Sequence, residues 1–494
     1  MAPAEPKRAR GMERGALRTA GVDATGRSFL PARTRIPWTT MLISNYSTPD
    51  FNPYGDTRVE KPNELWAAPV APGPVSASVA LPGSKSLTAR ELVLAALADG
   101  PSLLRAPLHS RDSAAMVEAL RSLGVRVEER EGSGGFGSDF LVTPAEELLG
   151  STTIECGQAG TVMRFVPPIA GLALGPTMFD ADDSARGRPM TAIIASLRGL
   201  GVEINDDGHG ALPFTVHGTG TVAGGAIEVD ASRSSQFVSA LLLSASRFEN
   251  GLDLTHSGER LPSLPHIEMT VAALAARGVA VDSPETGRWV VQPGPIAARD
   301  VDIEPDLSNA APFLAAAVVT GGSVTITGWP ESTTQVGADL AHLLPLFGAT
   351  VTKAVDRLTV TGPERIQGIR LDLTTGGELA PALVAIAALA DSPSEITGIG
   401  HICHHETDRL AALAAEINGF GGAVTELEDG LRVEPRPLTG GVWRSYEDHR
   451  MATAGAIVGL AVEGVEIENV ATTAKTLPHF TELWARMLDE SARP

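Results

Sequence analysis

Residues 81–90 place a lysine, two flanking serines and an arginine where a predicted strand meets a predicted helix. They read Leu81-Pro82-Gly83-Ser84-Lys85-Ser86-Leu87-Thr88-Ala89-Arg90. Alternating apolar and small polar residues over 75–81 predict the strand, and the Leu- and Ala-rich residues 91–98 predict the helix. Because a helix N-terminus offers free N–H groups and partial positive charge, this junction is a candidate anion site. The upstream glycine of a nucleotide P-loop is missing, and an ordinary capped helix is the alternative.

Other polar clusters come at the starts of apolar segments predicted to be buried helices. They are residues 158–164, 232–237, 376–378 and 446–452. A serine or threonine there can be a helix cap worth about 1 kcal/mol, which accounts for Thr161 or Ser234 taken singly. Capping does not account for four cations in short polar breaks between apolar segments: Arg188, Arg409, Arg450 and Lys475.

Residues 401–410 combine histidines, a cysteine and a glutamate, and they allow two interpretations. One is a zinc site, although the residues are too contiguous to turn to one ion and the sequence has no second Cys/His cluster. The other is a loop that enters a helix at Thr407 or Asp408. In that case His405 and Glu406 are titratable groups beside Arg409, suited to proton transfer.

Composition excludes several classes of protein. The chain has 494 residues, enough for roughly two to four domains. A formal charge of −20 and a pI of about 5.0 argue against nucleic-acid binding, so anion binding would need local clusters of cations. No apolar run reaches the length of a membrane span. Cys156 and Cys403 make no disulfide framework, which fits a reducing compartment.

The first 62 residues differ from the rest. Residues 1–36 contain eight Arg or Lys against three acids, which is similar to an organelle transit peptide but lacks clear amphipathicity. Met12 and Met41 are further possible start codons. We therefore expect residues 1–62 to be a disordered leader or to precede the true start.

A repeated pattern runs through the remainder. Five segments combine a helix end, a glycine and a short strand: 119–127, 196–204, 273–281, 343–351 and 416–424. Their glycines lie 70 to 77 residues apart, which indicates a duplicated unit. A glycine there suits the left-handed position after a helix. Each unit also holds an apolar helix, predicted at 164–174, 236–246, 310–319, 381–390 and 450–462. We expect the last helix, 480–488, to complete a sixth unit with the strand at 75–81.

Seven motifs occur in an order that resembles the 5-enolpyruvylshikimate-3-phosphate synthase family of enolpyruvyl transferases, over residues 68–490. They are residues 81–86 with Arg90, 159–161 with Arg164, 188–190, 234–236, 406–409, 448–452 and 473–476. The resemblance implies an α/β fold of two similar domains, each of three βαβαββ units in an inside-out barrel, with the active site in the cleft between them. We expect one discontinuous domain (63–83 plus 305–494) and one inserted domain (84–304).

The resemblance also implies a reaction. The 5-hydroxyl of 3-phosphoshikimate attacks phosphoenolpyruvate, and the tetrahedral intermediate then expels phosphate, as part of the shikimate pathway to aromatic amino acids. No metal or organic cofactor is expected. The implied partners are these two substrates alone, with no nucleic acid and no membrane, and the implied protein is a cytoplasmic monomer.

By similarity, the site residues divide into three groups. Those implied to hold 3-phosphoshikimate are Arg90 at its carboxylate, and Ser234, Ser235, Ser263 and Lys85 at its phosphate, with Ser86 and Gln236 between the two ligands. Those implied around phosphoenolpyruvate are Gly160, Arg188, His405, Arg409, Arg450 and Lys475. The catalytic groups implied are Glu378 as acceptor of the hydroxyl proton, Lys85 as its partner, and Glu406 near the methylene carbon.

The chain departs from the commonest pattern of this family at four positions. Glu378 stands where Asp is commonest, His405 where many members have Lys, Gln158 where many have Asn, and Phe165 where many have Pro. The longer Glu378 should keep its function. A histidine can be neutral at pH 7, so the sequence leaves open whether His405 contributes a positive charge to the site. The unsubstituted Gly160 leaves room for glyphosate, the family's inhibitor that competes with phosphoenolpyruvate, and sensitivity is expected.

Two alternatives remain at this stage. The related UDP-N-acetylglucosamine enolpyruvyl transferase usually carries a catalytic cysteine on a mobile lid, and neither Cys156 nor Cys403 resembles it. A non-catalytic anion-binding protein would keep the packing but lose isolated charged groups, whereas Glu378 and the cations are all present. Phosphate release in the presence of both substrates separates these alternatives from the transferase.

Overall fold

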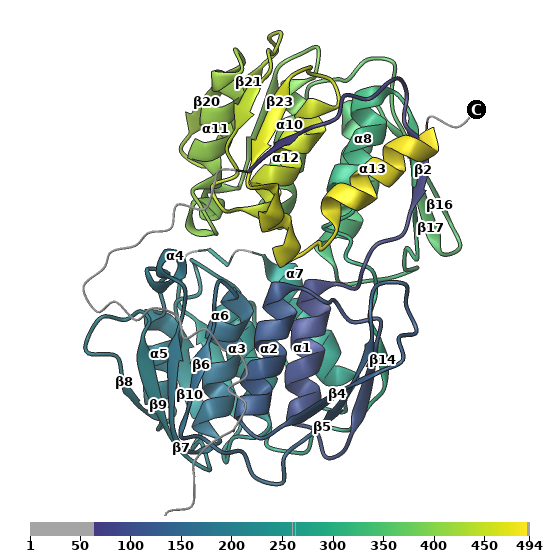
Figure 1. Cartoon of the computed structure of the whole chain (residues 1–494). Coiled ribbons are helices and arrows are strands. Elements are labelled where there is room, and N and C mark those ends of the chain that lie inside the picture. Colours follow the sequence, from purple (N-terminus) through teal and green to yellow (C-terminus); the bar gives the residue numbers. More distant parts are fainter. Residues whose placement is uncertain (1–63, 259, 262, 492–494) are drawn as a thin grey trace, which may run out of the picture. The chain divides into compact units, whose positions relative to one another are not determined.

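A computed structural model describes residues 64–491 of the chain, except residues 259 and 262. The predicted leader, residues 1–62, lies outside the described residues. The described part is a mixed α/β structure in which the strands form six small sheets (Figure 1). Among its helices none is long and apolar enough to cross a membrane.

Three sheets are built from residues 102–302. The strands of the first are β3 (Ser102–Arg105), β4 (Arg126–Arg130), β5 (Asp139–Thr143) and β14 (Val301–Asp302). Those of the second are β6 (Thr152–Glu155), β7 (Leu174–Asp180), β8 (Glu203–Asn205) and β9 (Phe214–Thr219). Those of the third are β10 (Gly225–Val229), β11 (Leu252–His256), β12 (Val281–Asp282) and β13 (Arg288–Val291).

The other three sheets combine the beginning of the described chain with its end. One contains β2 (Ser76–Val79), β15 (Ser323–Thr327), β16 (Thr350–Ala354) and β17 (Arg357–Thr361). Another contains β18 (Arg370–Asp372), β19 (Ser394–Thr397), β20 (Ala423–Leu427) and β21 (Gly430–Glu434). The last contains β1 (Leu65–Ala67), β22 (Gly441–Trp443) and β23 (Val465–Glu468).

Each four-stranded sheet repeats one arrangement, a parallel pair of strands followed by an antiparallel hairpin. In the sheet of β18 to β21, β18 is parallel to β19, and β21 lies antiparallel between β19 and β20. Helix α10 (Ala380–Ala388) joins the parallel strands and α11 (Arg409–Gly419) leads into the hairpin. The same order of elements occurs in the sheets of β6 to β9 and of β10 to β13. The described chain thus repeats a βαβαββ unit.

Two of these sheets receive their first strand from a distant part of the sequence. Strand β2 pairs in parallel with β15, and β14 pairs in parallel with β3. The chain passes from β2 to α1 (Lys85–Ala96) and from β14 to α8 (Ala311–Thr320). These two passages touch, since the Ser84 N–H donates to the Glu304 carbonyl at 2.7 Å. The prediction that the strand at 75–81 completes the last unit is wrong, because β1 pairs with β23 instead.

The buried apolar side chains form two separate clusters. One draws on residues 68–81 and 307–488, and the other on residues 89–296. Residues 64–83 with 305–491 are here called the outer half, and residues 84–304 the inserted half. In the inserted half, α1, α2 (Arg111–Ser122), α3 (Gly160–Gly171), α6 (Gln236–Ala245) and α7 (Leu264–Ala275) pack against one another (Figure 1). Two short helices, α4 (Asp183–Arg186) and α5 (Thr191–Gly199), complete the described helices of this half.

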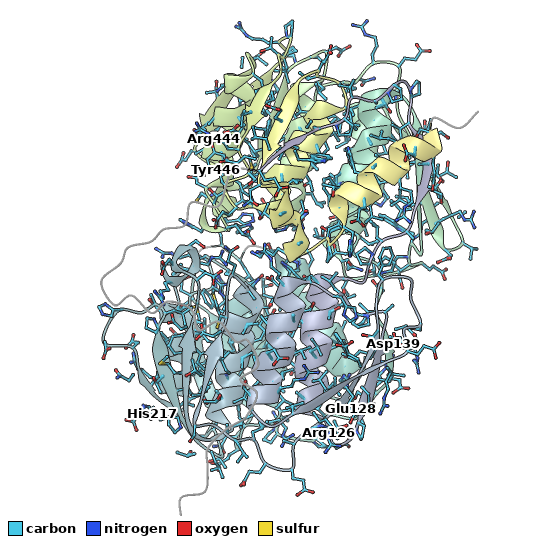
Figure 2. The ribbon with its side chains drawn as sticks, in the orientation of Figure 1. Arg126, Glu128, Asp139, His217, Arg444 and Tyr446 are labelled. Atoms are coloured by element: carbon cyan, nitrogen blue, oxygen red, sulfur yellow. The ribbon has the colours of Figure 1, made fainter. Side chains whose placement is uncertain are left out.

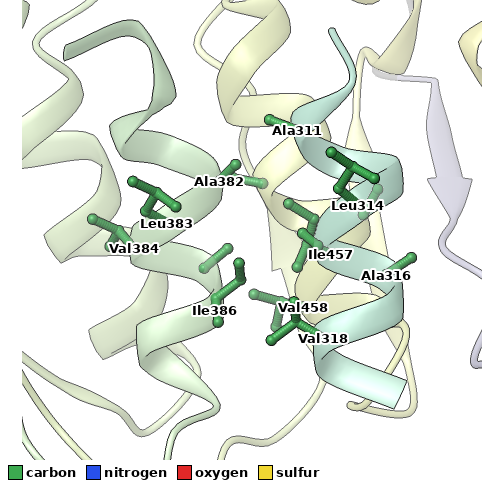
Figure 3. Close-up of a cluster of buried hydrophobic side chains, with 14 of the residues drawn as sticks. Ala311, Leu314, Ala316, Val318, Ala382, Leu383, Val384, Ile386, Ile457 and Val458 are labelled. Atoms are coloured by element: carbon green, nitrogen blue, oxygen red, sulfur yellow. The ribbon is translucent and has the colours of Figure 1, made fainter. Parts of the chain in front are cut away.

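The outer half has a matching core. Helices α8, α10 and α12 (His449–Gly459) pack together through side chains such as Leu314, Ile386 and Ile457 (Figure 3). Helix α13 (Phe480–Ser491) contacts β2, and α9 (Leu340–Leu343) precedes β16. The outer half also has 3₁₀ turns: η1 (Val336–Asp339), η2 (Leu344–Phe347), η3 (Gly377–Leu379), η4 (Gly400–His404) and η5 (Val470–Lys475).

The local predictions for the repeat are confirmed. The five glycines after the helices have φ angles of 79° to 97°, a region that an L-residue adopts only at a cost. The five apolar helices are α3, α6, α8, α10 and α12, and nearly all of their residues are buried. After Gly124, Val127 is buried in the core while Arg126 and Glu128 lie at the outer surface of β4 (Figure 2).

A buried ion pair joins Arg277, two residues after the end of α7, to Glu91 on α1 in the inserted half. The side chain of Arg277 is fully buried, and its Nε and Nη2 donate to Glu91 Oε2 at 3.0 and 2.8 Å. Its Nη1 donates to the Ser102 hydroxyl at 3.2 Å and to the Ala297 carbonyl at 3.1 Å. The hydrogen bonds of this guanidinium therefore join four separate segments of the chain.

Removal of one partner of this pair should destabilise the protein strongly. Glu91→Ala leaves a buried charge uncompensated, so we expect the free energy of unfolding in urea to fall by about 3–5 kcal/mol. The matched control is Asp253→Ala, which breaks an exposed ion pair: the side chain of Asp253 is 33% exposed and that of its partner Arg288 is 36% exposed. The free energy of unfolding should fall by no more than about 1 kcal/mol in this variant. Equal losses in the two variants would contradict this assignment.

Candidate active site

One pocket brings together all fifteen residues that the sequence predicts for the site. From the inserted half come Lys85, Ser86, Arg90, Gly160, Arg188, Ser234, Ser235, Gln236 and Ser263. From the outer half come Glu378, His405, Glu406, Arg409, Arg450 and Lys475. The pocket is also lined by residues that the sequence analysis did not select for the site: Asp112, Thr161, Arg164, Phe165, Pro189, Arg233, Phe237, His266, His401, His404 and His449.

Most of these residues lie where a helix begins. Helices α1, α3, α6, α11 and α12 start at Lys85, Gly160, Gln236, Arg409 and His449 respectively, and Ser263 precedes α7. Their amide groups and dipoles therefore favour anions in the pocket. The prediction that a loop enters a helix near Asp408 is confirmed, since the carboxylate of Asp408 caps α11 by accepting from the Ala411 N–H at 3.1 Å.

The charge of the pocket is opposite to that of the chain. Eight lysine and arginine residues line it against three carboxylates, those of Asp112, Glu378 and Glu406, whereas the chain as a whole has a formal charge of −20. Local clusters of cations set against a negative surface are what binding of small anions requires. The pocket is therefore suited to ligands that carry several negative charges.

In the outer half, the carboxylates of Asp448 and Glu406 hold two buried cations. Arg409, 2% exposed, donates from Nε and Nη2 to the fully buried Asp448 at 2.8 and 3.2 Å. Glu406 accepts from Arg409 Nη2 at 2.9 Å and from Lys475 Nζ at 2.6 Å. Burial alone would raise the pKa of Glu406, but Lys475 and Arg409 hold it well below its ordinary value. Glu406 is therefore ionised at neutral pH.

In the inserted half, Arg90 is held by neutral oxygens. It is 2% exposed, and its guanidinium donates to the Thr270 hydroxyl at 2.8 Å and to the carbonyls of Ser86 and His266 at 2.9 and 2.8 Å. Its Cζ lies 5.5 Å from the ring centroid of Phe165. Burial lowers the pKa of Arg90 to about 10, so it stays charged at pH 7. A cation surrounded by neutral groups is suited to an incoming carboxylate.

Glu378 contacts both halves of the molecule. Its Oε1 accepts from the Ser308 hydroxyl at 2.5 Å, its Oε2 lies 3.1 Å from His266 Nε2, and Arg450 Nη2 is 4.0 Å away. Burial would raise the pKa of Glu378, but His266, Arg450 and the Ser308 hydroxyl together hold it well below its ordinary value. The sequence analysis missed His266 and Ser308. The position of His266 three residues after Ser263, at the same helix start, is the signal that could have revealed it.

Several histidines of the pocket are neutral at pH 7. Burial lowers the pKa of His405 and of His449 well below the ordinary value, and lowers that of His401 to a lesser degree. His405 therefore adds no positive charge where many relatives are expected to have lysine. His405 Nδ1 lies 2.9 Å from Arg409 Nη1, so a neutral imidazole can accept a hydrogen bond from this guanidinium.

Neither cysteine is among the residues that line the pocket. Cys156 is buried, and burial raises the pKa of its thiol to about 12. Cys403 lies in η4, and burial raises its pKa as well. Among the described residues no group of three His, Cys, Asp or Glu side chains is arranged to hold a metal ion. The zinc interpretation of residues 401–410 therefore has no geometric support in the described part of the chain.

Comparison with known proteins gives a consistent result. A family model described as EPSP synthase (3-phosphoshikimate 1-carboxyvinyltransferase) matches residues 70–484. A protein of Kocuria rhizophila named 3-phosphoshikimate 1-carboxyvinyltransferase is 56% identical over 431 residues, covering 86% of this chain and 97% of that protein.

Two solved structures share the fold. EPSP synthase from Acinetobacter baumannii superposes with a TM-score of 0.71 at 23% identity, covering 86% of this chain and 98% of that one. The enolpyruvyl transferase NikO from Streptomyces tendae superposes with a TM-score of 0.67 at 19% identity, over 86% and 98% of the two chains.

The buried histidines should make stability depend on pH. The folded-state pKa of His449 lies below the unfolded value of about 6.5, so the unfolded chain binds the extra proton first as the pH falls. One such group lowers the free energy of unfolding by about 1.4 kcal/mol per pH unit below 6.5. In urea unfolding at pH 7.5 and 5.5, His449→Gln should therefore lose less stability on acidification than the wild type. His217→Gln, on β9 outside the pocket, is the control, and an unchanged loss in His449→Gln would contradict the assignment.

Proposed function

The chain belongs to the EPSP synthase family, the 3-phosphoshikimate 1-carboxyvinyltransferases, and from this premise we propose which residues carry out its reaction. The enzyme transfers the enolpyruvyl group of phosphoenolpyruvate to 3-phosphoshikimate, a step of the shikimate pathway to aromatic amino acids. The observation that carries the proposal is a pocket in which cations from both halves meet around Glu378.

The anionic groups of the substrates suit this excess of cations. Each substrate carries a phosphate and a carboxylate, so the site has to accommodate four anionic groups. Eight cations line the pocket, and Glu406, one of the three carboxylates, is already engaged by Arg409 and Lys475. Charge-assisted and bidentate hydrogen bonds to the remaining N–H groups can therefore fix both substrates.

We assign 3-phosphoshikimate to the inserted half. Arg90 would bind its carboxylate, and Lys85 with three serines would bind its phosphate: Ser234, Ser235 and Ser263. Two features support this assignment. Arg90 is charged and surrounded by neutral oxygens, and the serines precede α6 and α7, whose N-terminal amides favour a phosphate. Ser86 and Gln236 would lie between the two ligands.

We assign phosphoenolpyruvate to the space between Gly160 and the cations of both halves. The cations are Arg188, Arg409, Arg450 and Lys475, and the neutral His405 lies among them. Arg188 Nη1 donates to the Gln158 carbonyl at 2.9 Å, and Arg450 Nη1 donates to the Ser308 carbonyl at 3.2 Å. The rest of each guanidinium fork can therefore bind a phosphate or a carboxylate.

The proton transfers are assigned to three groups. As the hydroxyl oxygen of 3-phosphoshikimate bonds to C2 of phosphoenolpyruvate, its proton passes to Glu378. The electrons of the C=C bond take a proton at the methylene carbon from Lys85, which regains one from Glu378. Phosphate then leaves C2 with the electrons of the C–O bond as Glu406 takes a proton from the methyl group, which restores the double bond, and that proton leaves with the phosphate. Glu378 is ionised, as a general base must be. No metal or organic cofactor takes part in this assignment.

Three wider features belong to the same proposal. Residues 63–83 with 305–494, and residues 84–304, would form two domains that close on the substrates, supported by their separate cores. The enzyme would be a monomer with no nucleic-acid or membrane partner. It would act in the cytoplasm, which is consistent with two free cysteines in the described residues.

Phosphate release tests the function directly. The full chain is incubated with phosphoenolpyruvate and 3-phosphoshikimate, and inorganic phosphate is measured over time. Release should require both substrates, should not occur with UDP-N-acetylglucosamine as acceptor, and should survive Cys156→Ser and Cys403→Ser. Release that depends on UDP-N-acetylglucosamine, or no release with either acceptor, would overturn the proposal.

Replacement of the proposed base should separate binding from turnover. Glu378→Gln keeps the size of the side chain but cannot take a proton, so kcat should fall at least about 10²-fold, the scale of a lost general base. Calorimetric titration should still detect binding of both substrates. Lys85→Ala should weaken both binding and turnover. Wild-type kcat in Glu378→Gln would exclude Glu378 as the base.

A methyl group at Gly160 should change inhibition by glyphosate. A Cβ atom at this position would lie 2.7 Å from Arg164 Nη1, which is too close for a van der Waals contact, and 3.5 Å from Gln236 Oε1. The alanine would therefore displace the guanidinium of Arg164. We expect the wild type to be sensitive and Gly160→Ala to show an inhibition constant raised at least about tenfold, equivalent to about 1.4 kcal/mol. The KM for phosphoenolpyruvate is measured alongside. An inhibition constant equal to that of the wild type would refute the prediction.

A further inference from the structure

We propose that His266 is a positioning residue that acts through Glu378, by holding the carboxylate from the opposite half in the orientation that accepts the substrate proton. The inference rests on the base role proposed for Glu378. His266 Nε2 lies 3.1 Å from Glu378 Oε2, and the two side chains are 20% and 16% exposed. Because an ionised carboxylate only accepts hydrogen bonds, the imidazole must donate from Nε2.

The two oxygens of Glu378 are held by different halves of the molecule. Oε1 accepts from the hydroxyl of Ser308, in the outer half, at 2.5 Å. Oε2 faces His266 on α7, in the inserted half. A single hydrogen bond would leave the carboxylate free to turn about its last torsion, which has no sharp preference. Two donors, one to each oxygen, fix the plane of the carboxylate.

The position of His266 depends on the residues assigned to 3-phosphoshikimate. Its N–H donates to the carbonyl of Ser263 at 3.0 Å, which closes the first turn of α7. Its carbonyl accepts from Arg90 Nη2 at 2.8 Å and from the Thr270 hydroxyl at 3.0 Å. The backbone of His266 is thus hydrogen-bonded to Ser263 and Arg90, two of the residues proposed to bind this substrate, so the segment that binds the substrate also carries the imidazole that contacts the base.

The length of the side chain at position 378 matters to this contact. Aspartate is shorter by one carbon–carbon bond, about 1.5 Å. Since Nε2 and Oε2 are already 3.1 Å apart, Glu378→Asp would withdraw the carboxylate beyond hydrogen-bonding distance of His266. The pair therefore needs both residues as they stand in this chain.

The first test is steady-state phosphate release by the full chain with both substrates. His266→Phe keeps a flat ring but removes the donor, and His266→Gln restores an N–H at the place of Nε2. We expect His266→Phe to lower kcat by about 10- to 100-fold, the scale of a misplaced catalytic group. His266→Gln should recover most of that loss. His217→Phe, on the distant strand β9 (Figure 2), is the matched control and should leave kcat unchanged.

The second test is a double-mutant cycle. If His266 acts through Glu378, then His266→Phe should lower kcat less than about twofold in the Glu378→Gln background, because coupled residues show non-additive effects. The same loss of coupling is expected in Glu378→Asp. Additive effects, or equal losses of kcat in His266→Phe and His266→Gln, would overturn the proposal. If His266→Phe does not fold, His266→Asn, an amide too short to reach Glu378, replaces it in the comparison with His266→Gln.

The outcomes distinguish this inference from the function itself. A wild-type enzyme that releases no phosphate refutes the transferase assignment. A wild-type enzyme that does release phosphate, together with a His266→Phe variant of unchanged kcat, refutes only the role of His266. A fall in kcat with rescue by glutamine and non-additivity with position 378 supports both.

Discussion

Positive side chains that repel one another have to be held within a single pocket, and this electrostatic requirement governs the structure around the site. Eight cations line the pocket against three carboxylates. Carboxylates keep two of them in place, since Asp448 and Glu406 hold Arg409 while Glu406 also holds Lys475. Breaking such a buried pair is costly because the remaining charge is uncompensated. Arg409 and Lys475 are thus held in the pocket by carboxylates of the protein itself.

The repeated βαβαββ unit adds a second source of positive potential in the pocket, the N-termini of helices. Helices α1, α3 and α6 of the inserted half and α11 and α12 of the outer half begin at residues that line the pocket, so the site collects helix N-termini from both halves. The dipoles of these helices attract anions without adding net charge. The cost is that the site residues lie far apart in the sequence and depend on two cores for their alignment. The passages between the halves at Ser84 and Glu304 are in contact, so one short region connects the two cores.

Sequence patterns predicted those parts of the structure that local physics determines. The glycines after the helices need positive φ, and the apolar helices need burial, so both could be recognised from single segments. The resemblance to the family then implied fifteen site residues, all of which line one pocket. Strand exchange was predicted less well. A strand such as 75–81 carries no local mark of its partner, and pairing with β15 depends on a segment more than 200 residues away.

The groups that support the site residues were also beyond the reach of sequence patterns. Asp306 accepts from the Lys85 N–H at 3.0 Å, Ser308 donates to Glu378, and Asp448 holds Arg409. Asp306 and Lys85 come from different halves, whereas the other two pairs lie within the outer half, 70 and 39 residues apart in the sequence. His266 belongs with them, because its contact with Glu378 joins two halves that have separate cores.

A crystal structure with 3-phosphoshikimate and phosphoenolpyruvate bound is the most direct test of the claim that cations of both halves converge on two doubly anionic substrates. The phosphate of 3-phosphoshikimate should lie against Ser234, Ser235 and Ser263, with its carboxylate on Arg90. Phosphoenolpyruvate should lie between Arg188, Arg409 and Lys475. Both ligands bound by one half alone, or density outside this pocket, would contradict it.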